Sequence, residues 1–201
     1  MNVTDICNLA LSYISKERIN SLNDNSEEAK ECKIHYDHCR RRLLLAYSFG
    51  FAKSIHKLAE LEPERYKIPG WSHLYAYPES TLTVHYVYDE EHAGNKEDCR
   101  MEYEIIMNGE FDRVIATNVE NAYAECIHDV KEPDIFSEEF IDALAHMLAA
   151  SIAFPLTGSA NIQQTQLQLA QMALEAAEYQ SAIERERRTK FPRKYAESRF
   201  R

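Results

Sequence analysis

The chain has few of the residues that build tight catalytic loops. Only five glycines and six prolines occur among its 201 residues, and we find no glycine-rich phosphate loop, nucleophile elbow or paired zinc-ligand motif. Its five cysteines are odd in number and scattered, unlike a secreted disulfide framework. A reducing compartment is therefore the simpler expectation, and neither a catalytic residue nor a cofactor is predicted.

Long apolar runs and a basic leader are also missing. Residues 1–5 contain no basic residue, and no leader-like apolar run follows them. By inspection, no stretch approaches the roughly 20 consecutive apolar residues that a membrane span requires. We therefore expect no cleaved signal and no membrane association.

Charge of one sign dominates the chain but is unevenly spread. The formal net charge is −10, which disfavours a general DNA-binding protein, because duplex binding depends on neutralising phosphates with Lys and Arg. Residues 187–201 nevertheless carry +6, which leaves −16 on the remainder. An acidic body with a basic end predicts an acidic partner for that end.

The spacing of apolar residues predicts an α+β fold. Residues 72–130 alternate with a period of about two, and the rest has helical spacing. We expect a mainly helical bundle of about four helices with an inserted antiparallel β region, forming one domain over residues 1–188, followed by an extended basic tail at 189–201. The predicted helices are residues 5–15, 26–48, 137–154 and 161–188.

Each predicted helix has a start signal and an apolar stripe. The predicted N-caps are Thr4 or Asp5, the turn at 23–26, Ser137 with Phe136 and Ile141 as a hydrophobic staple, and Asn161. The second helix is predicted to bury Ala29, Cys32, Tyr36, Cys39, Leu43 and Ala46, the third Phe140, Leu144, Met147, Leu148 and Ile152, and the last Ile162, Leu169, Ala173, Ala176 and Ile183.

Two residues predict a break between the last two helices. Pro155 lacks an amide proton and its ring collides with the preceding turn, so the helix is expected to stop or kink there. Gly158 can then supply the left-handed position that closes many helices.

The β region carries one strong turn signal. Asn108-Gly109 predicts a two-residue hairpin turn, because both central residues of such a turn need positive φ. The polar run from Asp89 to Glu97 is expected to be an exposed loop.

One helical triplet could bind a metal. Cys32, His35 and Cys39 occur at i, i+3 and i+7, which offers three soft ligands on one face. A closed zinc site needs a fourth ligand, and buried Cys commonly has no chemical role, so core packing is favoured. Arg40 is expected to pair with a neighbouring acid, since Arg40, Arg41 and Arg42 fan around the helix and cannot form one phosphate patch.

Short motifs recur in a fixed order along nearly the whole chain. They are Asn8-Leu9-Ala10-Leu11, residues 19–24, Ala29, Cys32, Tyr36, Arg40, Leu43-Leu44, residues 49–52, Pro69-Gly70-Trp71, Tyr77-Pro78, residues 82–84, 115–118, 134–136, 148–150 and 153–159. This ordered series resembles the head-to-tail adaptor proteins of tailed bacteriophages, of the tail tubular protein A type, although Ile14-Ser15 stands where the family usually has Ile-Gly.

The resemblance implies a structural protein and not an enzyme. It implies a homo-oligomeric ring, a dodecamer in related virions, that docks under the portal protein and carries the tail tube or nozzle proteins. Double-stranded DNA would pass through the ring without sequence-specific binding. The location implied is the head–tail interface of the virion, after synthesis in the cytoplasm of the host bacterium.

The basic tail is the predicted portal-binding element. It interleaves aromatic anchors with charge, and the family tends to place an aromatic and an Arg where Tyr195 and Arg199 stand. The predicted binding residues are Arg188, Lys190, Phe191, Pro192, Arg193, Lys194, Tyr195, Arg199, Phe200 and Arg201.

Two other classes of function fit parts of the pattern. A helical protein-binding or regulatory module without a virion role would show the same amphipathic stripes and charged end. An enzyme using Cys32 and His35 is the other, and metal analysis of the purified protein would separate it from the rest.

Overall fold

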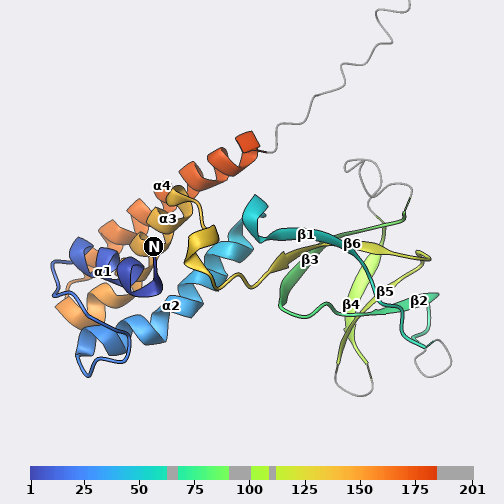
Figure 1. Cartoon of the computed structure of the whole chain (residues 1–201), viewed down its shortest axis with the longest axis horizontal. Coiled ribbons are helices and arrows are strands. Elements are labelled where there is room, and N and C mark those ends of the chain that lie inside the picture. The colour runs from blue at the N-terminus through green and yellow to red at the C-terminus, as the bar shows by residue number, and fades with distance from the viewer. Residues whose placement is uncertain (63–67, 91–100, 109–111, 185–201) are drawn as a thin grey trace, which may run out of the picture.

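The molecule divides into a helical half and a β half (Figure 1). A computed structural model describes residues 1–62, 68–90, 101–108 and 112–184. Within these residues there are four α-helices, two short 3-10 turns and two small antiparallel sheets, so the predicted α+β class is confirmed. The predicted tail at 189–201 and residues 91–97 of the predicted loop lie outside the described residues.

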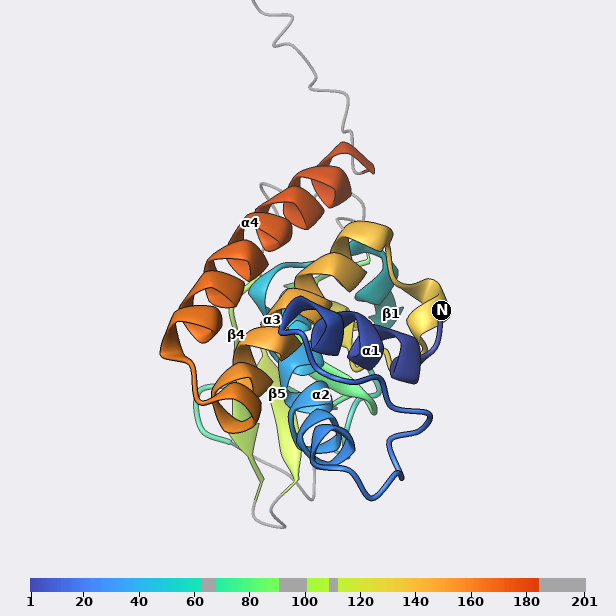
Figure 2. The same cartoon turned by 90° about the vertical axis from the view of Figure 1, so that its left-hand side faces the viewer.

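Helix α3 forms the centre of the helical half. The helices are α1 (Val3–Tyr13), α2 (Glu27–Ala46), α3 (Glu138–Thr157) and α4 (Ala160–Glu184). α3 packs against each of the other three, and Figure 2 shows α4 along one side of it with α1 and α2 on the others. The apolar face predicted for the third helix is confirmed, because Phe140, Leu144, Met147, Leu148 and Ile152 are all buried.

The composition of α3 follows from this central position. Among the described residues it is the one helix long and apolar enough to cross a membrane by length and composition. It nevertheless contains no run of about 20 consecutive apolar residues, because Asp142, His146 and Ser151 interrupt its sequence. In the structure 61% of its most apolar window is buried against protein, and a helix packed on several sides must be apolar all round.

The caps of the helices are partly as predicted. Ser26 and Ser137 cap α2 and α3, each accepting from the backbone N–H three residues on, at 3.2 and 3.3 Å. The cap predicted for α1 is wrong: Asn2 is the N-cap, and Asp5 is its reciprocal partner in a capping box. Asn161 is also not a cap, because Ser159 Oγ accepts from Ile162 N at 3.4 Å and Asn161 lies inside the first turn.

The C-terminus of α1 is a Schellman motif built without glycine. Lys16 N donates to Leu11 O at 3.0 Å and Ser15 N donates to Ser12 O at 3.2 Å. Ser15 has φ of +57°, the left-handed conformation that glycine adopts without steric cost. Ser15 stands where the adaptor family that this sequence resembles usually has glycine. Its backbone therefore has the conformation that a glycine would adopt there.

We expect Ser15→Gly to stabilise the protein by about 1 kcal/mol, because a left-handed residue with a Cβ costs roughly that amount. Urea denaturation followed by circular dichroism measures the change. Ser12→Gly is the control: Ser12 lies inside α1, where glycine lowers the free energy of unfolding. Equal effects of the two substitutions would contradict the argument.

The break between α3 and α4 lies at Gly158 and not at Pro155. α3 continues through Pro155 to Thr157, so the predicted end at residue 154 is wrong. A proline in the last turn removes only one backbone donor, and the helix tolerates it there. Gly158 has φ of +68° as predicted, and its N–H donates to Phe154 O at 2.9 Å.

We therefore expect Gly158→Val to cost about 1 kcal/mol or more, because a β-branched residue is strained at positive φ. Pro155→Ala is the matched variant and should leave the helix end in place. Urea denaturation and far-ultraviolet circular dichroism measure stability and helix content. A gain in helix content in Pro155→Ala, from fusion of α3 with α4, would show that proline sets the break.

The β half consists of two three-stranded antiparallel sheets that share one core. One sheet has the order β1 (Lys53–Lys57), β6 (Tyr123–His128), β3 (Thr81–Tyr88), and the other β2 (His73–Ala76), β5 (Arg113–Thr117), β4 (Tyr103–Met107). Both sheets contribute to the shared cluster of Leu58, Tyr75, Val84, Val87, Ile115, Ala122, Ala124 and Cys126. In β6 Cys126 packs in this cluster and Ile127 packs in the helical core, so β6 joins the two halves.

The predicted hairpin exists but has a longer connection. β4 and β5 pair antiparallel, with Met107 opposite Arg113, so residues 108–112 join them and a two-residue turn is wrong. The connection is closed by Asn108 N donating to Asp112 O at 2.8 Å and by Asp112 N donating to Asn108 Oδ1 at 2.9 Å. Strand β1 precedes the predicted β region and is an addition to it.

Candidate interaction surfaces

The predicted portal-binding residues cannot be placed in the structure. All ten, from Arg188 to Arg201, lie outside the described residues, and the described part of α4 ends at Glu184. Their role therefore stays a prediction from the sequence. Of the predicted site residues, Pro155 and Gly158 are described, and they lie at the α3–α4 connection.

The candidate metal triplet does not converge. Cys32 and Cys39 are buried in the helical core, whereas His35 lies at the surface with Nε2 3.4 Å from Glu31 Oε2. Cys39 Sγ contacts Ser151 Oγ at 3.3 Å, and burial raises the pKa of its thiol. Among the described residues no group of three His, Cys, Asp or Glu side chains could hold a metal ion. Cys32 and Cys39 are core residues, the interpretation that the sequence favoured.

Arg40 joins the two halves of the molecule through a buried ion pair with Asp129. Its side chain is fully buried, and Nη1 donates to Asp129 Oδ1 at 2.6 Å and to the Val130 carbonyl at 2.5 Å, just after β6. Nη2 also donates to Asp37 Oδ1 at 3.0 Å, which confirms the expected pairing with an acid. Arg41 Nη2 lies 2.9 Å from Asp129 Oδ2 on the outside of the pair.

The carboxyl group of Asp129 responds to both arginines. Burial acts to raise its pKa, but the hydrogen bond and charge of Arg40, followed by those of Arg41, outweigh burial, and the pKa is lowered. Asp129 is therefore held ionised at the junction between β6 and the helices. This arrangement is structural, since both arginines are already paired within the chain.

The buried face of α4 differs from the predicted stripe. Ala170, Ala177, Gln166 and Ser181 face the core, whereas Ile183 is 51% exposed. Gln166 is polar, so a pattern of apolar spacing does not indicate that it is buried. It makes two hydrogen bonds: Oε1 with His146 Nδ1 at 2.8 Å, and Nε2 donating to the Tyr13 carbonyl at 3.3 Å. Of the predicted residues, Leu169 and Ala176 are also exposed and Ile162 and Ala173 are half-buried.

A hollow lies on the outer face of α2. It has a volume of about 480 Å³ and is lined by Asp37, His38, Arg41, Arg42 and Leu45. Leu45 is 49% exposed, and Asp37 is already paired with Arg40. The hollow therefore combines exposed apolar surface with basic groups.

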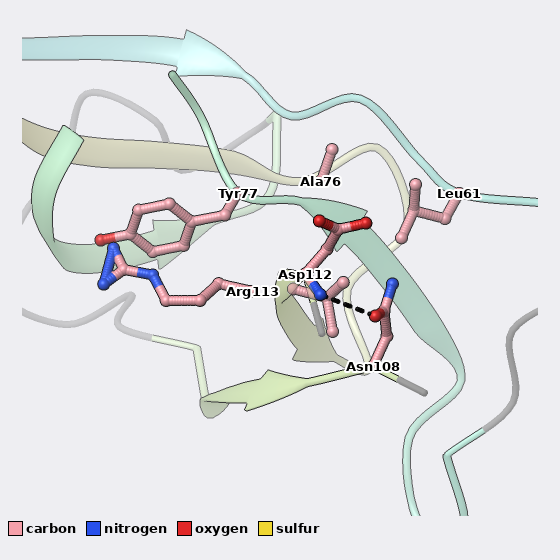
Figure 3. Close-up of a pocket in the computed structure, with 7 residues that line it drawn as sticks. Leu61, Ala76, Tyr77, Asn108, Asp112 and Arg113 are labelled. Atoms are coloured by element: carbon pink, nitrogen blue, oxygen red, sulfur yellow. Dashed lines mark hydrogen bonds between the residues drawn. The ribbon is translucent and has the colours of Figure 1, made fainter. Parts of the chain in front are cut away.

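A second pocket, of about 440 Å³, opens on the sheet of β2, β5 and β4 (Figure 3). The Arg113 guanidinium lies 3.9 Å from the centre of the Tyr77 ring, and Asn108 and Asp112 lie toward the other end. Burial raises the pKa of Tyr77, with Arg113 opposing the shift. Its described lining offers hydrogen bonds and a ring face but no paired acid and base, so we assign it no chemistry.

Ser54 lies between two histidines on the paired strands β1 and β6. Its hydroxyl is 2.5 Å from His128 Nε2 and 3.2 Å from His56 Nδ1. Burial and the neighbouring His128 lower the pKa of His56. A Ser–His contact alone lacks the group that orients the imidazole and the oxyanion donors that acyl transfer needs, so this cluster is a cross-strand contact.

Comparison with protein-family models and with curated proteins adds no relative. No protein-family model matches the chain, and no curated protein matches it. The functional interpretation therefore depends on the ordered motifs and on the structural positions that their residues occupy.

Proposed function

We propose that this chain is a structural head-to-tail adaptor of a tailed bacteriophage. It forms a homo-oligomeric ring that joins the portal protein to the tail tube or nozzle proteins and lines the DNA conduit. The observation that carries the proposal is the order of motif residues from Asn8 to Ser159, which resembles the tail tubular protein A type of adaptor over nearly the whole chain.

The motif residues of the first two helices have framework roles, as a structural protein requires. Asn8 holds the loop after α1 with two bonds: Nδ2 donates to the Ile19 carbonyl at 2.9 Å, and Oδ1 accepts from Ile19 N at 2.8 Å. Asp24 Oδ2 accepts from Asn20 N at 2.8 Å and from Ser21 N at 3.1 Å. The motif thus specifies how α1 is connected to α2.

The motif at residues 49–52 forms the aromatic centre of the helical half. Phe49 and Phe51 both pack against Phe140 of α3 at ring-centre distances of 5.1 Å. Gly50 N donates to Ser181 Oγ of α4 at 3.3 Å, and Phe136 lies 5.6 Å from Phe51. This cluster fixes the end of α2 against α3 and α4, which a load-carrying ring subunit needs.

The acidic charge of the body suits a DNA conduit. Residues outside the basic end carry a net −16, and phosphate binding requires the opposite sign. Repulsion between like charges favours passage of double-stranded DNA over binding, and no sequence-specific contact is needed. The proposed location is the head–tail interface of the virion, after synthesis in the cytoplasm of the host bacterium.

Sedimentation velocity of the protein with and without its cognate portal protein tests the proposal. We expect mostly monomer at micromolar concentration in the free protein and a portal-bound ring in the mixture. Absence of any portal association, or infectious virions that lack the protein, would overturn the adaptor assignment. A stable monomer that does not bind the portal would favour the alternative function, a helical protein-binding or regulatory module without a virion role.

A further inference from the structure

The outer face of α4 carries a second apolar stripe that nothing in the described chain covers. Its residues recur with the three- and four-residue spacing of a heptad seam: Leu169, Met172, Ala176, Tyr179 and Ile183. Met172 is 66% exposed and Tyr179 is 71% exposed, although α4 buries its opposite face against α3. An apolar helix face is normally buried against another element, so the second apolar face of α4 also requires a partner.

This stripe is acidic as well as apolar. The 25 residues of α4 contain Glu175, Glu178 and Glu184 and no Lys or Arg. Glu175 stands three residues after Met172 and four before Tyr179, so it projects from the same face as these two side chains. A surface of this kind calls for a basic and partly apolar partner.

The outer face of α2 has the complementary character. Ile34 is 65% exposed, and the hollow at the C-terminal half of α2 exposes Leu45 between Arg41 and Arg42. Ile34, His38, Arg41 and Leu45 follow at i, i+4, i+7 and i+11, so they share one side of the helix. The hollow of about 480 Å³ can accept a large side chain such as Tyr179.

We infer that α4 of one subunit docks on α2 of a second copy of this chain, with Tyr179 in the hollow beside Arg41 and Arg42 and Glu175 facing Arg42. The inference deepens the proposed function, because a ring needs one such contact between neighbours. Helices α2 and α4 lie on different sides of α3 (Figure 2), so one subunit can use both helices at once. An interface between two different patches is head to tail, the kind that closes into rings.

A symmetric contact between two copies of α4 fits the charges less well. It would place Glu175 and Glu178 of one helix against those of the other, and like charges at close range oppose association. The pairing of α4 with α2 instead brings carboxylates to guanidinium groups.

Cysteine crosslinking distinguishes the two arrangements. Tyr179→Cys and Leu45→Cys are made separately in a Cys99→Ser background, since Cys7, Cys32, Cys39 and Cys126 are buried. A short thiol-specific crosslinker should give dimers in the mixture of the two variants and not in either variant alone. The experiment is done with concentrated free protein and with portal present. Dimers in Tyr179→Cys alone, or no dimers in the mixture under either condition, would overturn the inference.

Charge exchange provides an independent measurement. Arg42→Glu and Glu175→Arg should each weaken self-association about fivefold, and the double variant should recover most of the loss, because exposed ion pairs contribute up to that factor. Glu104→Arg, an exposed position on β4, is the matched control and should have no effect. Additive losses in the double variant would contradict the pairing.

The proposed function and this inference fail in different ways. If the protein does not associate with portal but the mixed variants crosslink, the α4–α2 contact is supported and the adaptor role is wrong. If wild-type protein forms portal-bound rings that Arg42→Glu and Glu175→Arg leave unchanged, the adaptor role stands and the α4–α2 contact is wrong.

Discussion

Removal of residues 189–201 should leave the helical and β halves folded and abolish portal binding. The last buried residue among those described is Ser181 of α4, and the predicted domain ends at residue 188, before the truncation. The tail combines Phe191, Tyr195 and Phe200 with basic residues, and aromatic anchors flanked by charge account for most of the affinity of many interfaces. Circular dichroism checks folding, and sedimentation with portal checks binding.

The charge of the tail can be tested without removing its aromatic residues. Replacing Arg193, Lys194 and Arg199 with Glu should weaken portal binding and flatten its dependence on salt, because screening acts on the attraction that is removed. The matched control exchanges the same residues as Arg193→Lys, Lys194→Arg and Arg199→Lys, which keeps the charge. Portal binding by the truncated protein as tight as that of the full chain would show that another segment binds the portal.

Arg40→Met should lower the free energy of unfolding by about 3 kcal/mol, because it leaves Asp129 buried with less compensation. The Asp129 side chain is only 12% exposed, and Arg41 remains its partner, so we expect the lower end of the range for broken buried pairs. Urea denaturation measures the loss. Arg42→Met, on the exposed side of α2, is the control and should change stability by less than about 0.5 kcal/mol.

The contribution of this pair should depend on pH in one direction. The pKa of Asp129 is lowered in the folded protein below its ordinary value of 3.8. Its ionised form therefore stabilises the fold above that value, and this stability is lost as the pH falls through the lower folded pKa. Wild type should lose stability in acid more steeply than Arg40→Met. Parallel acid profiles of the two proteins would show that Arg40 does not hold the Asp129 charge.

The sequence predicted the β4–β5 hairpin but neither the length of its connection nor strand β1. The hairpin of β4 and β5 was predictable because Asn108-Gly109 directly follows the alternating run from Tyr103 to Met107. Its five-residue connection was not, since the closing bonds between Asn108 and Asp112 depend on the loop geometry. Strand β1 was missed because Lys53–Lys57 has one apolar residue, Ile55, which is 39% exposed, and pairing with β6 is what makes it a strand.

In the last helix the apolar pattern is strong, but it fits two different faces of α4. α4 is apolar on two faces, and the predicted stripe mixed them, taking in Leu169 and Ile183. The buried side was hidden because Gln166 and Ser181 are polar, and they are buried only because Tyr13, His146 and Gly50 supply their hydrogen bonds. Residues that are far apart in sequence decide which face is inside.

Local chemistry was enough to determine the α+β class, the caps Ser26 and Ser137, and the left-handed glycine at 158, because each depends on residues within a turn or two. The same holds for the buried face of α3, because its apolar residues recur at helical spacing along the sequence. Only the tertiary structure decided that Arg40 reaches Asp129 across the junction and that Leu45 of α2 and Met172 and Tyr179 of α4 stay exposed. Those features depend on distances between elements, and apolar spacing along one chain carries no information about them.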